Sequence, residues 1–573
     1  MEGKVYGIDL GTTYCAIATL DENGLPEIIE NTDDASQLLA SAVYFPQGGG
    51  DPVVGAAAKN QSEIEPDRVV QYVKREIGKP DAQVREFDGV KYDPVTVSAL
   101  ILKRMKEYAD AQGHNVNDVV VTCPAYFGNE ERNATREAGK IAGLNVLNIV
   151  NEPTAAALNY CCREFRENRK IMVYDLGGGT FDITLFDFSV DNSGKASIDV
   201  IRTGGNDRLG GIDWDARLFS HICEQYADEE GVAQDEMDSE LRQRIRSEVE
   251  TTKKALSNMP RKSFTINYAG SPTRLEVERE KFEELTHDLT ERTMDFVRQL
   301  LSDANISDSD VDVVLLVGGS TRMPMIKAAV DALFPGKVRV EQPDLAVAKG
   351  AALAAAVEWN ERLLDFIEKK EASGDAEDSS SGSSLFGDQP ITAEEAKRLM
   401  KPVPAIIPEK GFISDKLSRS FGPAIINERN EYVIDNLLFL GDETPAEASQ
   451  QYGTMTDNQT LVDINIYENV AEDRVNKYVT PCFNERDEEQ ATDPALKVKS
   501  LGKVVLELPP GMPKGSPIEV TFRCSTAGLG VKARNPATNQ SVETFITSEN
   551  TKSQEEMDEA IKRFASIRTS GQI

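Results

Sequence analysis

Histidine and cysteine, the residues that build many metal sites and nucleophilic centres, are sparse in this chain. Its 573 residues include three histidines, His114, His221 and His287, and seven cysteines without a C-x-x-C pair. Histidine-based zinc sites and catalytic triads therefore have no support in the sequence. An odd number of cysteines also argues against a disulfide framework, so Cys161 and Cys162 are expected in a buried helix rather than a redox centre.

Excess positive charge and long apolar runs are missing too. Acidic residues outnumber basic ones by 96 to 63, which gives a formal net charge of -33 at pH 7. Nucleic acids and anionic membranes are polyanions, so neither is expected as a main partner. No apolar run is long enough to span a bilayer, and the first predicted strand begins too close to the amino terminus to leave room for a signal peptide. The cytoplasm is the expected location.

The chain is too long for one hydrophobic core, and we expect at least two domains. Ser373 to Ser384 contains too few apolar residues to order itself, which predicts a flexible linker. Before this segment, apolar runs alternate with helical patterns such as Val97 to Tyr108 and Leu241 to Leu256, which indicates α/β layers. After it, alternating and β-branched runs predict strands at 461–467 and 518–522.

One short pattern occurs twice. Residues 5–13 read Val-Tyr-Gly-Ile-Asp-Leu-Gly-Thr-Thr, and residues 171–182 read Ile-Met-Val-Tyr-Asp-Leu-Gly-Gly-Gly-Thr-Phe-Asp. In each copy an apolar run ends in Asp-Leu-Gly and a second apolar run follows, which predicts strand, glycine turn and strand. A single Asp-Leu-Gly would suggest only an ordinary hairpin. Two copies with matching flanks, a domain's length apart, predict a duplicated domain.

The two glycine turns indicate a phosphate site. Glycine allows the backbone to approach a ligand closely, and successive amide groups in such a turn converge on an anion. Asp9 and Asp175 precede the turns, and their carboxylates would repel bare phosphate, which favours a magnesium ion held partly through water. The chain has neither a G-x-x-x-x-G-K-[ST] loop nor a G-x-G-x-x-G loop, so no other nucleotide pattern competes. The repeat therefore predicts magnesium-nucleotide binding.

A third glycine turn lies at 318–321, between the apolar run Val313 to Val317 and a helical pattern at 325–333. Strand, turn and helix in this order fit a shelf for a nucleoside. Further upstream, spacings of three, four and seven residues place four polar side chains on one helical face: Glu250, Lys253, Lys254 and Ser257. Taken alone, such a face is usually solvated.

Several further segments are motifs of a known family. They are Val121-Thr-Cys-Pro-Ala-Tyr-Phe127, Asn151-Glu-Pro-Thr-Ala-Ala-Ala157, Leu209-Gly-Gly-Ile-Asp-Trp214 and Val317-Gly-Gly-Ser-Thr-Arg-Met-Pro324. With the glycine turns, and in this order and spacing, they make the chain resemble the seventy-kilodalton heat-shock (DnaK-type) chaperones. The resemblance implies an actin-like (duplicated ribonuclease H-like) α/β ATPase domain followed by an all-β sandwich domain and a short C-terminal helix. The expected boundaries are 1–365 for the ATPase domain, 366–405 for a flexible polar linker, 406–548 for the substrate-binding sandwich and 549–573 for the helix, a residual lid.

The resemblance further implies ATP hydrolysis, with ATP/ADP and Mg2+ as cofactors and K+ as an additional expected ion. The family pattern gives catalytic roles to Lys74, beside the terminal phosphate, and to Glu152, Asp175 and Thr180, around the attacking water and the second phosphate loop. Asp9 and Asp175 would organise water around the magnesium ion. The remaining residues on the phosphate side are Gly11, Thr12, Thr13, Tyr14, Gly177, Gly178, Gly179, Asp182, Gly210 and Gly211.

The adenosine side follows from the same resemblance. One wall comprises Glu250, Lys253, Lys254 and Ser257, and the opposite wall comprises Gly318, Gly319, Ser320, Arg322 and, further on, Asp344. The family has arginine where this chain has Lys254. Lysine lacks the planar face that stacks on a base, so adenine should be held less tightly. Pro124 and Arg132 match positions that relay nucleotide state to the substrate domain.

Unfolded or extended polypeptide segments are the substrates that the resemblance implies, with a J-domain co-chaperone and a nucleotide exchange factor as further partners. Candidate loops of the substrate cleft lie at 421–426 and 437–439, although these apolar residues could equally form sandwich core. The family's acidic, leucine-rich linker is not recognisable, and the nearest apolar stretches are Leu385-Phe386 and Pro402 to Ile407. The segment between Lys74 and Pro124 is also shorter than is usual in the family.

Only one helix is evident after residue 548. Ser553 and Glu556 form a capping box, and Met557, Ile561 and Phe564 make one apolar stripe. Since most of the family's helical lid is missing, we expect weak, quickly exchanging substrate binding. The sequence thus predicts an ATP-dependent chaperone of protein folding and stress response. The alternatives are a nucleotide-gated adaptor for one protein partner and, disfavoured by the β-rich C-terminal part, a small-molecule kinase.

Overall fold

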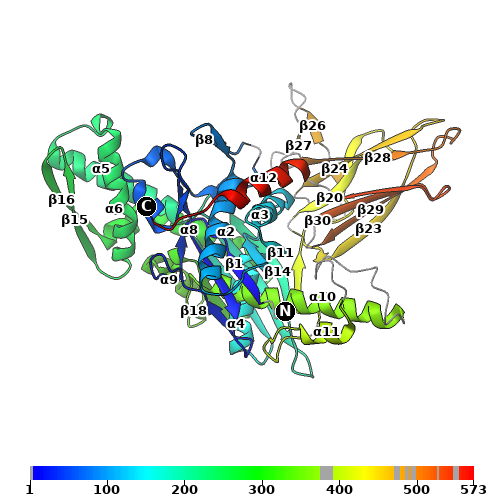
Figure 1. Cartoon of the computed structure of the whole chain (residues 1–573), viewed down its shortest axis with the longest axis horizontal. Helices are drawn as coiled ribbons and strands as arrows, with labels where there is room; N and C mark the ends of the chain where they lie inside the picture. Colours follow the sequence, from blue (N-terminus) through cyan, green and yellow to red (C-terminus); the bar gives the residue numbers. More distant parts are fainter. Residues whose placement is uncertain are drawn as a thin grey trace.

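The computed structural model describes residues 4–79, 81–373, 391–408, 410–417, 419–469, 478–479, 481–483, 489–491, 498–525, 528–545 and 554–572. The N-terminal part of the chain forms two lobes with matching sheets, and a β-rich region follows (Figure 1). No helix in the described ranges is both long and apolar enough to cross a membrane.

The first lobe is built on a sheet with the strand order β11-β10-β1-β2-β3. Its strands are β1 (Val5–Asp9), β2 (Tyr14–Leu20), β3 (Pro26–Ile28), β10 (Asp118–Cys123) and β11 (Asn145–Asn151). A sixth strand, β4 (Leu39–Ala40), pairs with β2. Around this sheet lie the strands β5 (Ala42–Tyr44), β6 (Val53–Val54), β7 (Val69–Gln71), β8 (Arg85–Phe87) and β9 (Val90–Tyr92) and the helices α1 (Ala56–Gln61), α2 (Pro94–Ala111) and α3 (Asn129–Ile141).

The second lobe repeats the first. Its sheet begins with the order β18-β17-β12-β13-β14, and β12 is parallel to β17 and antiparallel to β13, just as β1 is parallel to β10 and antiparallel to β2. The strands are β12 (Arg169–Leu176), β13 (Phe181–Val190), β14 (Ala196–Asn206), β17 (Val313–Val317) and β18 (Val338–Val340). Both predicted hairpins with glycine turns are therefore present, at equivalent places in the two sheets.

Helices and one hairpin cover the second lobe. They are α5 (Gly211–Glu230), α6 (Ser239–Leu256), α7 (Arg279–Leu285), α8 (His287–Asp303), α9 (Pro324–Leu333) and the pair β15 (Arg261–Tyr268) and β16 (Ser271–Glu278). Local sequence fixes where the longer helices begin: the Asp93 carboxylate accepts a hydrogen bond from the Thr96 amide at the start of α2, and the Asp238 carboxylate accepts one from the Leu241 amide at the start of α6. Such caps satisfy amide groups that have no partner within the helix.

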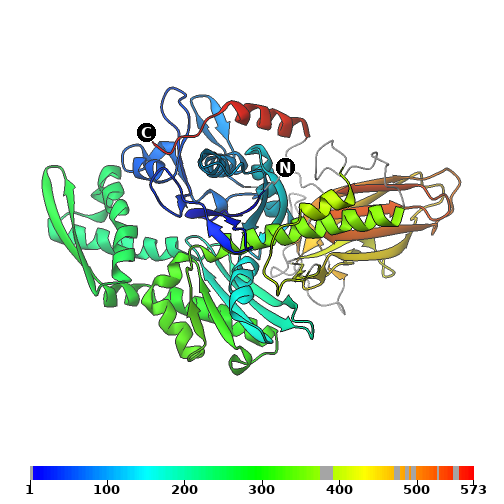
Figure 2. The same cartoon turned by 60° about the horizontal axis from the view of Figure 1, so that its bottom comes forward.

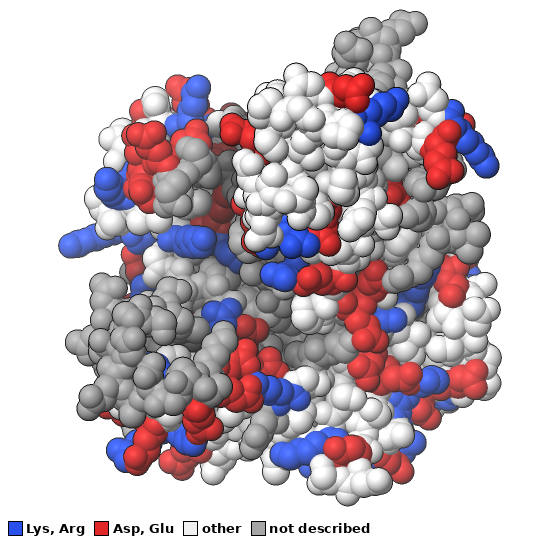
Figure 3. All heavy atoms as spheres, turned by 90° about the vertical axis from the view of Figure 1, so that its right-hand side faces the viewer, with Lys and Arg blue, Asp and Glu red and all other residues white. Residues whose placement is uncertain are grey.

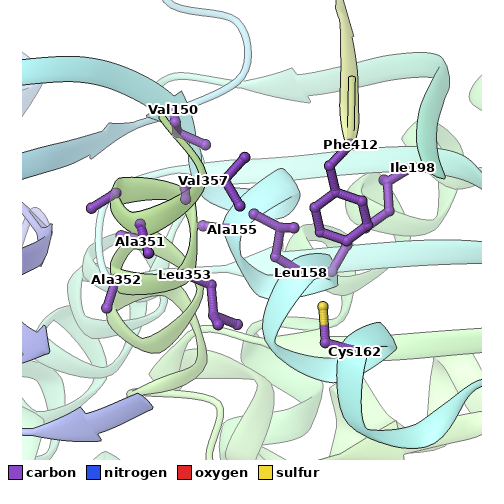
Figure 4. Packing of buried hydrophobic residues seen from close by; sticks show 14 of the residues in the cluster. Val150, Ala155, Leu158, Cys162, Ile198, Ala351, Ala352, Leu353, Val357 and Phe412 are labelled. Atoms are coloured by element: carbon purple, nitrogen blue, oxygen red, sulfur yellow. The ribbon is translucent and has the colours of Figure 1, made fainter. Parts of the chain in front are cut away.

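The two lobes join through a shared core around α4 (Glu152–Glu164) and the long helix α10 (Ala346–Ser373), which runs on toward the β-rich region (Figure 2). The alanine-rich first half of α10 lies close to α4, and a Cβ on Gly350 would fall 1.6 Å from the carbonyl oxygen of Ala155. Only small residues allow this approach. Figure 4 shows Ala351, Ala352 and Leu353 of α10 beside Ala155 and Leu158 of α4.

Residues 391–408 and 410–416 pack against the two lobes. The helix α11 (Ala393–Arg398) lies beside α10, and the Trp359 indole donates a hydrogen bond to the carbonyl of Leu399. The strand β19 (Ile413–Lys416) then adds to the second sheet next to β14, and Phe412 is fully buried beside Ile198 (Figure 4). Of the predicted linker 366–405, residues 366–373 continue helix α10 and residues 391–405 are held on the lobes, whereas Leu385-Phe386 lies outside the described residues.

The β-rich region contains two antiparallel sheets, ordered β25-β21-β20-β24-β28 and β23-β29-β30-β31. Their strands are β20 (Ser420–Ile426), β21 (Tyr432–Asp435), β23 (Ala446–Gly453), β24 (Leu461–Asn469), β25 (Tyr478–Val479), β28 (Lys499–Glu507), β29 (Pro517–Ser525), β30 (Gly528–Arg534) and β31 (Ser541–Phe545). Side chains of both sheets share one core, which includes Phe421 and Leu438 from the expected cleft loops. Acidic and basic side chains are interspersed on the face of the molecule that Figure 3 shows.

The last helix, α12 (Gln554–Ser566), lies beside α3 of the first lobe (Figure 1). Met557 and Phe564 are buried there in the first-lobe core. The sequence-based hypothesis assigned this helix to a lid of the substrate domain, whereas its described contacts are with the first lobe. Ser553 of the expected capping box lies outside the described residues.

Candidate active site

A cavity of about 950 Å3 lies between the two lobes. All predicted site residues line it except Gly179, Asp182, Gly210 and Gly211. The first lobe supplies the turn after β1, the segment around Lys74 and the start of α4. The second lobe supplies the turn after β12, one face of α6 and the turn after β17. The structure therefore brings together segments that are more than 300 residues apart in the chain.

The glycine turns of the two hairpins lie directly against each other. A Cβ on Gly178 would come within 2.3 Å of the Thr13 side chain, and one on Gly179 within 2.4 Å of the Thr12 side chain. These distances are far below van der Waals contact, so only glycine permits the approach. The backbone amides of the two turns and the threonine hydroxyls thus gather on one wall of the cavity, a suitable arrangement for anionic oxygens.

The four predicted residues that do not line the cavity support it from behind. The Gly211 amide donates to the Gly177 carbonyl at 3.0 Å, and a Cβ on Gly210 would fall 2.6 Å from the backbone of Gly179. The Asp182 carboxylate accepts a hydrogen bond from the Ala125 amide at 3.0 Å. Asp182 therefore connects the second glycine turn to the segment that includes Pro124.

Lys74 lies at the floor of the cavity, in a short 3-10 turn at Val73–Arg75, and is paired with Glu152. Burial alone would lower the pKa of Lys74, but Glu152 and Asp9 outweigh it and raise the pKa above its ordinary value. Burial, with the Glu152 charge adding to it, raises the pKa of Asp9 to about 7 and also raises that of Asp175. The floor thus places several carboxylates around one ammonium group.

This surplus of negative charge fits a divalent cation. Asp9 and Asp175 lie at the ends of equivalent strands and both line the cavity, and the Asp9 charge raises the pKa of Asp175, so both face one region. Within the described ranges, however, no three side chains of the types His, Cys, Asp and Glu gather closely enough to hold a metal ion directly. A magnesium ion at this place would take most of its ligands from water and phosphate, as magnesium usually does.

The opposite part of the cavity is formed by α6 and the turn after β17. Lys253 pairs with Asp215 of α5 at 2.7 Å, and the Ser320 hydroxyl donates to the Gly177 carbonyl at 2.8 Å. The Arg322 guanidinium donates to Asp344 at 2.9 Å. The third glycine turn is therefore tied to the second by the Ser320 hydrogen bond.

Four side chains meet across the two lobes beside the cavity, and we name them the cross-cleft latch: Tyr14, Lys59, Glu250 and Lys254. Lys59 of α1 forms an ion pair with Glu250 of α6, and the Tyr14 hydroxyl donates to Glu250 at 3.1 Å. Burial opposes ionisation of Glu250, but Lys59 and Lys254 lower its pKa to about 2. The ammonium groups of Lys59 and Lys254 also lie over the Tyr14 ring, 4.9 and 4.8 Å from its centroid.

Several residues of the site were not foreseen from sequence. Arg75 donates to the Gly179 carbonyl at 2.8 Å and pairs with Asp213 at 2.9 Å, so it links the first lobe to the second glycine turn. Lys59 had no motif that pointed to it. Asp215 could have been found, because it lies four residues after Gly211 on the same face of a helix that begins with that motif.

A model of the Hsp70 family, with the description Hsp70 protein, matches residues 5–367. The matched range covers well over half of the chain and contains both lobes, the cavity and every predicted site residue. It ends before α11 and the β-rich region.

Proposed function

Because the chain belongs to the Hsp70 family, we propose that it hydrolyses ATP in the cavity between its lobes and uses nucleotide state to control the binding of unfolded polypeptide segments. Members of this family are ATP-dependent chaperones with an actin-like ATPase domain, and they use ATP and Mg2+. The observation that carries the proposal is the buried Lys74–Glu152 pair beside Asp9 and Asp175, at the end of a cavity walled by two glycine turns.

In this proposal each side chain has a role that follows from its place. Lys74 supplies positive charge where the terminal phosphate meets the floor, and Glu152 keeps that ammonium group in position. Asp175 and Thr180 hold the attacking water in line, while Thr12, Thr13 and the backbone amides of the turns bind phosphate oxygens. Magnesium, held through water by Asp9 and Asp175, would neutralise charge on the phosphates.

The adenosine part of the nucleotide would lie between α6 and the turn after β17. Lys254 stands where the family has arginine, and its ammonium group is engaged with Glu250 and with the Tyr14 ring. It therefore offers no planar surface to a base. We expect a nucleotide affinity that is set mainly on the phosphate side.

For the β-rich region we propose binding of extended polypeptide segments, with a J-domain co-chaperone and an exchange factor as the partners that the family implies. Because α12 contacts the first lobe, it is not available to hold a bound segment on the β-strands while it stays there. Bound segments should exchange quickly. A slow release of a fluorescent peptide in the presence of ADP would contradict this.

Single-turnover hydrolysis tests the proposal. Purified protein with a stoichiometric amount of radiolabelled ATP and Mg2+ is followed with and without a permanently unfolded polypeptide, and Lys74→Ala serves as the active-site control. Hydrolysis that Lys74→Ala reduces by about 100-fold or more and that several unrelated polypeptides accelerate supports a chaperone. Absence of hydrolysis would refute the proposed reaction.

A nucleotide-gated adaptor is the second candidate, and the position of α12 favours it. A helix packed on the first lobe leaves no described lid over the β-strands, and a single folded partner needs none. Lys74-dependent hydrolysis that ignores unfolded polypeptides would select the adaptor.

A further inference from the structure

The C-terminal segment, residues 554–572, crosses the outer surface of the first lobe, and we name it the C-terminal strap. Its helix α12 buries Met557 and Phe564, of which 7% and 1% remain exposed, in the core of that lobe. Lys103 of α2 donates a hydrogen bond to the Phe564 carbonyl at the end of the helix. The guanidinium of Arg563 lies over the Tyr92 ring of β9 at 4.9 Å. The strap is therefore fixed to α2, α3 and β9 by packing as well as by polar contacts.

Beyond the helix the strap continues as extended chain. Arg104 of α2 donates to the Thr569 carbonyl at 3.2 Å, and the Thr569 hydroxyl donates to Glu107. Ser570 then pairs with β6: its amide donates to the Pro52 carbonyl at 3.0 Å, and its carbonyl accepts from the Val54 amide at 2.8 Å. The strap thus forms one isolated parallel β-bridge, Ser570 with Val53 of β6, at the edge of the small sheet β6-β5-β7.

The strand that Ser570 contacts, β6, lies only a few residues before Lys59 of the cross-cleft latch. Val54 is followed by Gly55, the residue that caps α1, and by α1 itself, which carries Lys59. The side chain of Val53 packs in one small cluster with Ala58 of α1. Ser570 is thus connected, through β6 and the first turn of α1, to the residue whose ammonium group pairs with Glu250 of the second lobe.

From these contacts we infer that the C-terminal strap regulates nucleotide release by holding α1, and with it Lys59, in the position that closes the cleft. This inference rests on the proposed function, because it concerns release from the same cavity. The strap acts as a brace on the first lobe, and Lys59 is a positioning residue that reaches across the cleft. When the strap detaches, β6, which leads into α1, loses its bridge to Ser570, and the contacts of the latch weaken.

The first measurement is the dissociation rate of a fluorescent ADP analogue from the full chain in Mg2+, chased with excess unlabelled ADP. Phe564→Ala, which empties the anchor of α12, should speed release by about fivefold or more, the size of a typical coupling between two sites. Lys59→Ala should do the same. In the double variant the effects should not add, because Phe564→Ala acts through Lys59. Glu559→Ala, on the exposed face of α12, is the matched control and should release at the wild-type rate.

Hydrogen exchange of the nucleotide-free protein is the second measurement and does not depend on catalysis. Phe564→Ala should raise exchange in residues 554–572 and, with it, in residues 53–61. Ser570→Pro removes the amide that donates to Pro52, leaves the helix anchored, and should raise exchange in 53–61 and around residue 570 but not in 554–566. If the strap exchanges freely in these variants while 53–61 and the release rate stay as in wild type, the inference is wrong. If wild-type protein binds no ADP, the proposed function fails and the regulation of release fails with it, while the exchange of 53–61 still shows whether the strap holds α1.

Discussion

The ammonium group of Lys74 is paired with the carboxylate of Glu152 at a point where the two side chains have only 5% and 9% of their surface exposed. An ion pair this deeply buried adds little net stability when it is intact, but breaking it strongly destabilises the fold. Removing one partner leaves a charge in a poorly solvated place, and here Asp9 and Asp175 add further negative charge.

Replacing Lys74 with methionine should therefore lower the free energy of unfolding of the nucleotide-free protein by about 3 kcal/mol at neutral pH. Urea unfolding followed by tryptophan fluorescence measures the change. Adding Glu152→Gln to Lys74→Met should recover part of the loss, since the uncompensated carboxylate is then gone. Lys281→Met, which breaks the exposed pair of Lys281 with Glu284, is the control and should change stability by no more than about 0.5 kcal/mol. Equal stability of Lys74→Met and wild type would show that the pair is not formed.

Gly178→Ala should force the two glycine turns apart. The added methyl group would lie 2.3 Å from the Thr13 side chain, and overpacking of this kind costs about 1–3 kcal/mol. Gly177→Ala is the matched variant in the same turn, because its methyl group would meet nothing nearer than 3.6 Å. Thermal unfolding without nucleotide should separate the two substitutions. Equal melting temperatures would mean that the turns do not touch.

A pH dependence is expected where the β-rich region meets the first lobe. Glu468 of β24 lies beside Gly128 at the start of α3, near Glu131 and 4.0 Å from Arg419. Burial, which outweighs the Arg419 charge, raises the pKa of Glu468 from 4.5 to about 7. The folded state therefore binds more protons than the unfolded state between these values, and this carboxyl group weakens folding progressively as pH rises from about 4.5 to 7.

Glu468→Gln should accordingly stabilise the protein at pH 8 by about 1–3 kcal/mol, and the advantage should vanish below about pH 4.5. Denaturant unfolding at a series of pH values is the test. Glu447→Gln, on an exposed strand and paired with Arg523, should show no such trend. A constant difference between Glu468→Gln and wild type across the series would rule out titration of this group.

Lys254→Arg should tighten nucleotide binding. Arginine keeps the charge beside Glu250 and the Tyr14 ring, and it adds a planar group that can stack on adenine. A stacking gain of about 0.5–1 kcal/mol corresponds to an affinity increase of about two- to fivefold. Calorimetric titration should show a larger gain in affinity for ADP than for inosine diphosphate, because adenine is the base on which the arginine is expected to stack. Unchanged affinity for both would place this residue away from the base.

The sequence was sufficient for features that depend on local pattern. Alternation and glycine placement predicted both hairpins, and the repeat predicted the two matching sheets, because strand, turn and strand are encoded within about ten residues. Helical spacing likewise predicted that Glu250, Lys253, Lys254 and Ser257 share a face, and all four line the cavity.

Contacts between distant segments were beyond the reach of such patterns. Arg75 and Lys59 look like any exposed basic residue in the sequence, and their partners on the second lobe are known only once the lobes are placed together. The apolar stripe of α12 was evident, but a stripe shows which face is buried and not which surface covers it. Residues 391–405 were predicted to belong to a flexible polar linker, yet the side chain of Ala396 is fully buried against the lobes.

The pairing of β19 with β14 also determines where this chain can be divided. Ile198 and Asp199 of β14 lie opposite Ile413 and Ser414, so the second sheet receives an edge strand from far along the chain. A fragment that stops at the end of the family match, near residue 367, would leave β14 as an open edge and uncover Ile198. Unprotected edges recruit strands from other molecules and promote aggregation. A fragment of the two lobes that remains monomeric should therefore extend through Lys416.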